Sequence, residues 1–223
     1  MGGVDYEEEL LRYLVNLGNI TPLTSGNISV IDLARGLVFI KPSGMRGDEI
    51  KKEDISVVDM NGVVIGGKKP SVDLPIHLEI YKKNPGAKSI VHTHSHFATV
   101  ASCIYDEIPI NTTLHADYIK NSIPVLKENN FRKDLSKAAA NLIYESKSPA
   151  ILMSNHGLFA IGSSCGEAFK TAVACEEVCR LHFFMSLIAG ATGRTIRKIP
   201  EEVVNAHIER FKHEYGQEMI KGS

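Results

Sequence analysis

The chain has 223 residues, of which 43% are hydrophobic and 23% charged, and its formal net charge is -1. This composition supports a full apolar core and excludes general disorder. The near-zero charge provides no broad field for nucleic acid or an anionic membrane, so we expect neither partner. No Pro/Gly/Ser-rich stretch divides the chain, which predicts a single domain over residues 1–223.

The N-terminal segment lacks a basic region followed by an apolar run, and no segment reaches the ~20 apolar residues needed to span a bilayer. We therefore expect a cytoplasmic protein. The four cysteines form no C-x-x-C pair. Reduced, buried thiols are expected rather than a disulfide or a thiolate metal site.

The first part of the chain begins as a helix and then changes to strands. Apolar residues at helical spacing before Gly18 predict an amphipathic helix over 6–17 with a glycine cap. A period of two follows, and it predicts strands at 28–33 and 37–41 and a hairpin over 55–66. Asn61-Gly62 in the hairpin favours a type I′ turn.

Helices and strands alternate after residue 73. Asp73 and Pro75 are typical of a helix start, so we expect a helix that continues to residue 83. The elements expected next, in chain order, are a strand over 89–94, helices over 96–104 and 132–146, strands over 150–155 and 158–162, and a long, largely buried helix over 166–190. The pattern predicts an α/β sandwich around one sheet, with ligands at the ends of its elements.

Three histidines are candidate metal ligands. His92 and His94 lie on one face of the predicted strand because side chains alternate with period two. His96 shares the parity but falls where the strand becomes a helix, so it ranks below them. His156 precedes Gly157 in a tight turn and is the expected third ligand. The His-x-His pattern alone also fits ordinary polar strand residues.

Three turn segments supply hydroxyl, amide or ammonium donors that can bind an anion. They are Ser25-Gly26-Asn27, Lys41-Pro42-Ser43-Gly44 and Lys69-Pro70-Ser71. Each alone is a common turn. Their shared position before the helix that starts at Asp73 favours convergence into one phosphate site.

Seven segments, in order along most of the chain, resemble the class II aldolase/adducin family. They are TSGNISVID, RGLVFIKPSG, KKPSVDLPIHLEIY, IVHTHSHFAT, LHADYIKNSIP, NHGLFAIG and the C-terminal YGQ. Within the family they resemble L-ribulose-5-phosphate 4-epimerases more than L-fuculose-1-phosphate aldolases. The resemblance implies a three-layer α/β/α sandwich with a central, mainly antiparallel sheet. It also implies a homotetramer with active sites at subunit interfaces.

The resemblance further implies roles for individual residues. His92, His94 and His156 match the metal ligands, with Zn²⁺ expected and another divalent metal as the alternative. Asp73 matches the acidic residue near the metal. The residues that match the phosphate-binding segments are Asn27, Lys41, Ser43, Gly44 and Ser71.

The acid/base residues also follow from the resemblance. Asp117 matches the catalytic aspartate of the epimerases, Tyr215 their second acid/base, and His207 the histidine upstream of that tyrosine in the substrate site. Four departures keep the aldolase alternative open. The spacing from His207 to Tyr215 and the connection between Asp117 and His156 are shorter than in the family. Val72 replaces an expected serine, and Ser25 stands where the bacterial epimerase has tryptophan and the aldolase has serine.

The expected reaction is cleavage of a ketose-phosphate carbon–carbon bond through a metal-stabilised enediolate. Proton donors on both sides of the C4 oxygen would convert L-ribulose 5-phosphate into D-xylulose 5-phosphate. An aldolase, which needs one such donor, would instead release dihydroxyacetone phosphate and an aldehyde. A dehydratase or decarboxylase on the same scaffold and a non-catalytic, adducin-like interaction module are further alternatives.

Overall fold

The computed structural model describes residues 5–127 and 134–213. Within these ranges one sheet has the strand order β4-β3-β2-β1-β5-β9-β8-β7-β6. Neighbouring strands are antiparallel except β7 and β8, which are parallel. The strands are β1 (Asn27–Asp32), β2 (Leu37–Ile40), β3 (Ser56–Asp59), β4 (Val64–Gly66), β5 (Ser89–Thr93), β6 (Glu107–Ile108), β7 (Ile123–Leu126), β8 (Ala150–Met153) and β9 (Gly157–Gly162).

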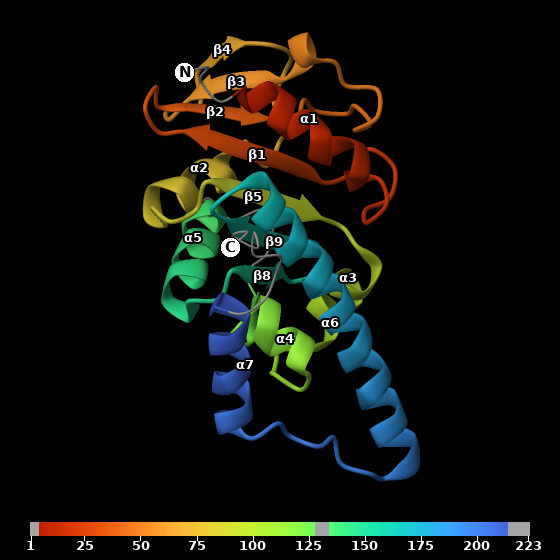
Figure 1. Ribbon diagram of the computed structural model, residues 1–223. Coiled ribbons are helices and arrows are strands. Elements are labelled where there is room, and N and C mark those ends of the chain that lie inside the picture. Colours follow the sequence, from red (N-terminus) through yellow and green to blue (C-terminus); the bar gives the residue numbers. More distant parts are fainter. Residues whose placement is uncertain (1–4, 128–133, 214–223) are drawn as a thin grey trace, which may run out of the picture.

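Helices cover both faces of this sheet (Figure 1). They are α1 (Tyr6–Leu17), α2 (Leu74–Lys83), α3 (His96–Ile104), α4 (Thr113–Tyr118), α5 (Leu135–Ser146), α6 (Cys165–Thr192), α7 (Glu201–His213) and the short 3₁₀ helix η1 (Lys52–Asp54). One apolar cluster joins α2 and α5 to the sheet through residues such as Ile80 and Ile143. A second cluster on the opposite face joins α1, α3 and α6. The predicted three-layer α/β/α class is confirmed.

The central strand β5 has both faces covered, so all five of its residues are buried. Ile90 belongs to the cluster under α2 and α5, and Val91 to the cluster under α1, α3 and α6. His92 has the same parity as Ile90 and is fully buried. The C-terminal end of β5 therefore brings an imidazole into the interior beside the edge of the α2 layer.

Gly18 is the C-terminal cap of α1, as predicted, in a right-handed conformation (φ -60°), and its N–H donates to the carbonyl oxygen of Asn16. One other local prediction is wrong in detail. The β3–β4 hairpin is present, yet Gly62 has a positive φ (85°) and Asn61 does not, which rules out a type I′ turn. The carboxylate of Asp59 accepts hydrogen bonds from the backbone N–H groups of Asn61 and Val63, and this stabilises a longer turn.

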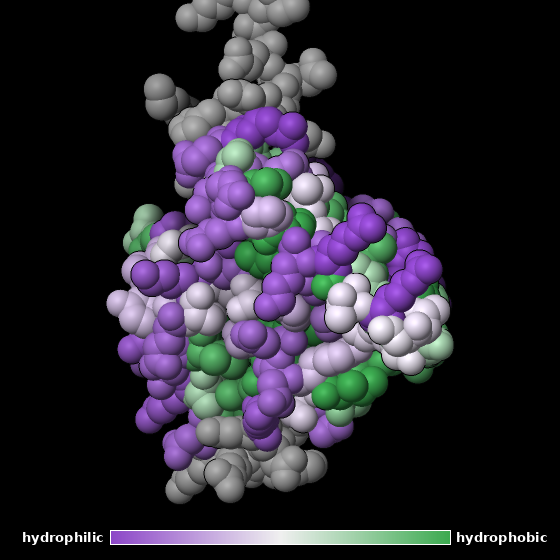
Figure 2. Space-filling model, turned by 90° about the horizontal axis from the view of Figure 1, so that it is seen from below, coloured by the Kyte–Doolittle hydropathy of each residue, from purple (hydrophilic) through white to green (hydrophobic). Residues whose placement is uncertain are grey.

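The long helix α6 is buried only in its first part. Its buried residues end at His182, and Phe184, Leu187 and Ile188 are 46%, 57% and 59% exposed. Figure 1 shows this end of α6 leaving the sheet and α7, which the sequence analysis did not predict, running back beside α4. Figure 2, seen from that side, shows apolar residues in patches between hydrophilic ones.

The cysteine prediction holds for three of the four residues. Cys165, Cys175 and Cys179 are buried free thiols, whereas Cys103 is exposed near the end of α3. None of the helices within 5–127 and 134–213 is long and apolar enough to cross a membrane.

Candidate metal centre and substrate site

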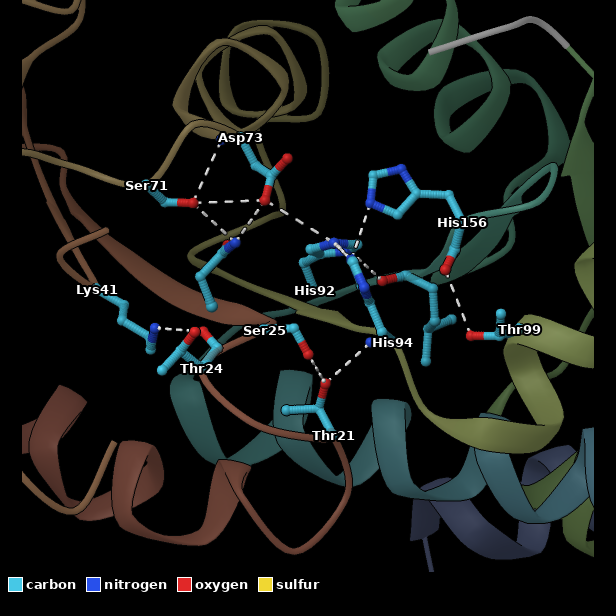
Figure 3. Close-up of polar contacts among 12 residues, drawn as sticks. Thr21, Thr24, Ser25, Lys41, Ser71, Asp73, His92, His94, Thr99 and His156 are labelled. Atoms are coloured by element: carbon cyan, nitrogen blue, oxygen red, sulfur yellow. Dashed lines mark hydrogen bonds and ion pairs between the residues drawn. The ribbon is translucent and has the colours of Figure 1, made fainter. Parts of the chain in front are cut away.

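The three predicted histidines converge at one point (Figure 3). The Nε2 atom of His94 lies 2.9 Å from Nε2 of His92 and 2.9 Å from Nε2 of His156. One ligand nitrogen from each residue lies within 4.8 Å of the others. His92 is the last residue but one of β5, His94 follows that strand, and His156 lies in the turn between β8 and β9.

Strand pairing explains why residues so distant in the sequence meet. In the β5–β9 ladder Thr93 pairs with Leu158, so the turn before β9 passes beside His94. A Cβ atom on Gly157 would lie 2.2 Å from the backbone oxygen of Thr93. Glycine is therefore required there for His156 to approach β5.

The surroundings keep these imidazoles neutral. Burial lowers the pKa of His92 to about 3, and it also lowers the pKa values of His94 and His156. The Nδ1 atom of His92 lies 2.8 Å from the carbonyl oxygen of Leu158, so Nδ1 carries the proton and Nε2 presents a lone pair to its neighbours. Neutral imidazoles with converging lone pairs fit a divalent transition metal such as zinc.

Asp73 lies directly beside this cluster. Its Oδ2 atom is 3.8 Å from Nε2 of His92 and accepts a 2.7 Å hydrogen bond from Nδ2 of Asn27. Burial raises the pKa of Asp73. The positive charge that nearby histidines, His92 first, carry when they are protonated lowers it, as does the Asn27 hydrogen bond, and the net pKa lies below the ordinary value. Asp73 precedes α2 without a side-chain capping bond to described residues, which leaves its carboxylate facing the histidines.

The predicted phosphate segments lie on the Asp73 side of the cluster (Figure 3). Nδ2 of Asn27 donates to Oγ of Ser71 at 3.0 Å, and Oδ1 of Asn27 is buried without a hydrogen-bond partner among the described residues. Lys41 is 3% exposed, and its Nζ atom donates to the carbonyl oxygen of Thr24 at 3.0 Å. Burial lowers the pKa of Lys41, and Asp73 opposes that shift.

Backbone pairing joins two of these segments. Pro42 and Pro70 form an antiparallel bridge, and the Ser43 N–H donates to the carbonyl oxygen of Lys69 at 2.9 Å. Ser43 and Gly44 are exposed in the turn next to Lys41. The structure therefore brings Asn27 and Ser71 together beside Asp73 and leaves Ser43 and Gly44 at the surface of the same region.

Asp117, the predicted acid/base residue within the described ranges, lies away from the histidine cluster. Oδ1 of Asp117, on α4, lies 2.9 Å from Nδ1 of His207, on α7. Asp117 lines a hollow of about 620 Å³ with Tyr13 and Lys170. No contact between Asp117 and the three histidines is present within residues 5–127 and 134–213. Tyr215 lies outside the described residues.

A separate open hollow of about 640 Å³ lies over the histidine cluster. Its lining residues are His94, His96, Thr99, Val100, Asn155 and His156. His96 is exposed at the start of α3 and is not part of the converging group, in agreement with its lower rank.

Sequence reasoning missed the threonines that hold two of the ligands. Oγ1 of Thr21 accepts a 3.1 Å hydrogen bond from the His94 N–H, and Oγ1 of Thr99 donates to the carbonyl oxygen of His156 at 3.3 Å. The paired residues are 73 and 57 positions apart. No local pattern in the sequence indicates contacts of this kind.

Comparisons with known proteins find similarity along most of the chain. Residues 9–183 match the family described as Class II Aldolase and Adducin N-terminal domain. L-ribulose-5-phosphate 4-epimerase UlaF of Salmonella paratyphi C (strain RKS4594) is 36% identical over 220 residues, which cover 94% of this chain and 92% of that protein.

Two solved structures are similar over nearly the whole chain. An L-fuculose 1-phosphate aldolase has a TM-score of 0.83 and 29% identity, with 95% of this chain and 98% of that chain covered. YgbL of Klebsiella pneumoniae, for which aldolase, epimerase and decarboxylase are named as alternatives, has a TM-score of 0.78 and 29% identity, with 92% and 99% covered.

Proposed function

The chain belongs to the class II aldolase and adducin family, and on that premise we propose that it is a zinc-dependent enzyme that converts L-ribulose 5-phosphate into D-xylulose 5-phosphate. The observation that carries the proposal is the convergence of three neutral imidazoles beside the Asp73 carboxylate. A non-catalytic interaction module does not need such a group of metal-binding side chains. The 36% identity to an L-ribulose-5-phosphate 4-epimerase favours this substrate.

In this proposal His92, His94 and His156 hold the ion. A divalent cation there would polarise the ketose carbonyl and stabilise the negative charge of an enediolate after the C3–C4 bond breaks. Neutral imidazole ligands leave the full cationic charge available for this purpose. Asp73, ionised because its pKa is low, lies close enough to moderate that charge.

The phosphate group would lie on the Asp73 side of the metal. There Lys41 supplies an ammonium group and Asn27 and Ser71 supply an amide and a hydroxyl. The exposed Ser43 and Gly44 backbone extends this surface. Such a cradle fixes one end of the sugar and leaves its other end toward the hollow lined by His96 and Thr99.

Asp117 would exchange a proton with the C4 oxygen, with Tyr215 on the opposite side. Within one chain Asp117 faces a different hollow from the histidines. We therefore propose that it acts on the metal centre of a neighbouring subunit in a homotetramer. The exposed apolar side chains of Phe184, Leu187 and Ile188 on α6 support association with other copies.

The test is a product assay on zinc-loaded protein. We expect D-xylulose 5-phosphate from L-ribulose 5-phosphate, and the Asp117→Asn variant should lose most of this activity because general acid–base catalysis contributes about 10²–10⁴-fold. Absence of turnover by the loaded wild-type protein would contradict the proposed epimerisation.

The second candidate function is an aldolase that releases dihydroxyacetone phosphate from L-fuculose 1-phosphate. Ser25 favours it, because this position carries serine in the aldolases, and its hydroxyl lies 3.1 Å from that of Thr21 beside His94. The structural similarity to an L-fuculose 1-phosphate aldolase points the same way. Detection of dihydroxyacetone phosphate with that substrate, without epimerase activity, would select this alternative.

A further inference from the structure

The helix α3 begins beside the histidine cluster and lacks a capping side chain of its own. Ser95 occupies the capping position, but its hydroxyl lies 3.1 Å from that of Thr93 and makes no capping bond within the described chain. Glu176 on α6 takes this role instead. Its two carboxylate oxygens accept hydrogen bonds of 2.9 Å each from the Phe97 and Ala98 N–H groups.

The hydrogen bonds from the start of α3 to the Glu176 carboxylate are favourable for two reasons. The first N–H groups of a helix have no partners within the helix and carry partial positive charge. A carboxylate that binds two of them satisfies both donors and is favoured by the helix dipole. Glu176 lies on α6 between Cys175 and Cys179, which are buried in the core. The start of α3 is thus fixed to a well-packed helix.

The position of α3 determines the positions of two metal ligands. His94 lies two residues before the helix and is connected to it through Ser95. His156 comes from another element, and its carbonyl oxygen accepts the hydrogen bond from Thr99 on α3. A displacement of α3 would therefore move both imidazoles relative to His92, which is held independently by the β5 ladder and by the Leu158 carbonyl.

We propose that Glu176 is a positioning residue for the metal centre. By fixing the start of α3 it keeps His94 and His156 at the correct distance from His92. The inference rests on the proposed metal site and concerns the affinity of that site for its ion. Residues that orient metal ligands without touching the metal typically change metal affinity 10–100-fold when they are replaced.

The first experiment compares zinc affinity in two variants of neighbouring glutamates. Glu176→Gln keeps the size of the side chain but replaces one acceptor with an N–H group that faces the α3 donors. We expect its zinc dissociation constant, measured by competition with a chelating indicator, to rise about tenfold. Glu177→Gln makes the same change one residue later, where the side chain is paired with Arg180 near solvent, and should bind zinc like the wild type.

The second experiment tests whether the effect passes through α3. Thr99→Val removes the hydroxyl donor to His156 with little change in shape, and it should also weaken zinc binding. If Glu176 and Thr99 act on the same helix, the double variant will lose less affinity than the product of the two single fold-changes. Cobalt absorption spectra of the same variants report the ligand geometry independently of activity.

A merely structural role predicts a different pattern. In that case Glu176→Gln would lower the melting temperature of the metal-free protein but bind zinc with wild-type affinity below that temperature, which would overturn the inference while the proposed function stands. Failure of the wild-type protein to bind zinc would overturn both. If Glu176→Gln does not fold, unchanged zinc affinity in Thr99→Val would overturn the inference.

Discussion

The imidazole of His92 stacks on the ring of Phe159, with centroids 4.1 Å apart and planes inclined by 18°. The two residues pair directly across the β5–β9 ladder. Phe159 is fully buried, and its ring is also inclined by 70° to that of His77, with centroids 5.8 Å apart. The Phe159 ring therefore packs against one face of a proposed metal ligand, and it also fills the core under α2 and α5.

This contact predicts a combined effect of Phe159→Leu on stability and metal binding. Loss of the aromatic contact should lower the free energy of unfolding by about 1 kcal/mol, and the less constrained His92 should bind zinc more weakly. Urea unfolding of the metal-free protein and zinc titration measure the two effects. Phe39→Leu is the matched control, because Phe39 is also buried and stacks on Tyr6, away from the histidines. It should affect stability alone.

A second prediction concerns Lys41 in the proposed phosphate cradle. Lys41→Met should raise KM for a sugar phosphate about 10–100-fold, because a hydrogen bond to a charged group contributes about 1.5–3 kcal/mol. The change in kcat should be smaller, since Lys41 lies on the phosphate side and not at the bond that breaks. Lys82→Met, at an exposed position in the last turn of α2, is the control and should leave KM near the wild-type value. Equal effects in both variants would contradict the assignment.

A third prediction follows from two buried histidines outside the cluster of His92, His94 and His156. Burial lowers the pKa values of His77 and His115 to about 4, against an ordinary value of 6.5. Between these pH values the unfolded chain binds more protons than the folded one. The contribution of these groups to the free energy of unfolding is therefore fully present above pH 6.5 and is lost as the pH falls toward 4. The free energy changes by up to about 1.4 kcal/mol per pH unit for each group.

Urea unfolding of the metal-free protein at pH 7.5 and pH 5.0 measures this loss. His115→Gln is the variant to compare, because its amide can still donate to the Asn121 carbonyl, which lies 2.8 Å from Nε2 of His115. The difference in stability between the two pH values should be smaller in this variant. An unchanged difference would show that His115 does not titrate on unfolding.

Local pattern was sufficient for most of the fold and for the convergence of the three histidines. The parity of His92 and His94 in a short apolar strand, and a glycine after His156, indicate that three imidazoles can meet. Contacts that depend on helix packing left no such signal. Glu176 contacts α3 through Phe97, a residue 79 positions away in the chain. The pairing of His207 with Asp117 depends on the packing of α7 beside α4. The sequence analysis missed α7 although Val204, Ile208 and Phe211 recur at helical spacing.

The final prediction concerns the subunit that supplies Asp117. Asp117→Asn and His94→Gln should each abolish most activity, the first by removing the proposed acid/base and the second by removing a metal ligand. If each active site combines histidines from one subunit with Asp117 from its neighbour, mixed oligomers will contain some sites with both groups intact. Unfolding and refolding the two variants together should therefore restore part of the activity that neither has alone.

The control is a mixture of His94→Gln with His92→Gln. Both changes affect the same half of the site, so no combination of these subunits creates an intact centre, and activity should stay at the level of the single variants. Recovery in the first mixture but not in the second would assign Asp117 to the neighbouring subunit. Absence of recovery in the first mixture, with mixed oligomers demonstrated by mass spectrometry, would mean that Asp117 reaches the histidines of its own chain or takes no part in the reaction.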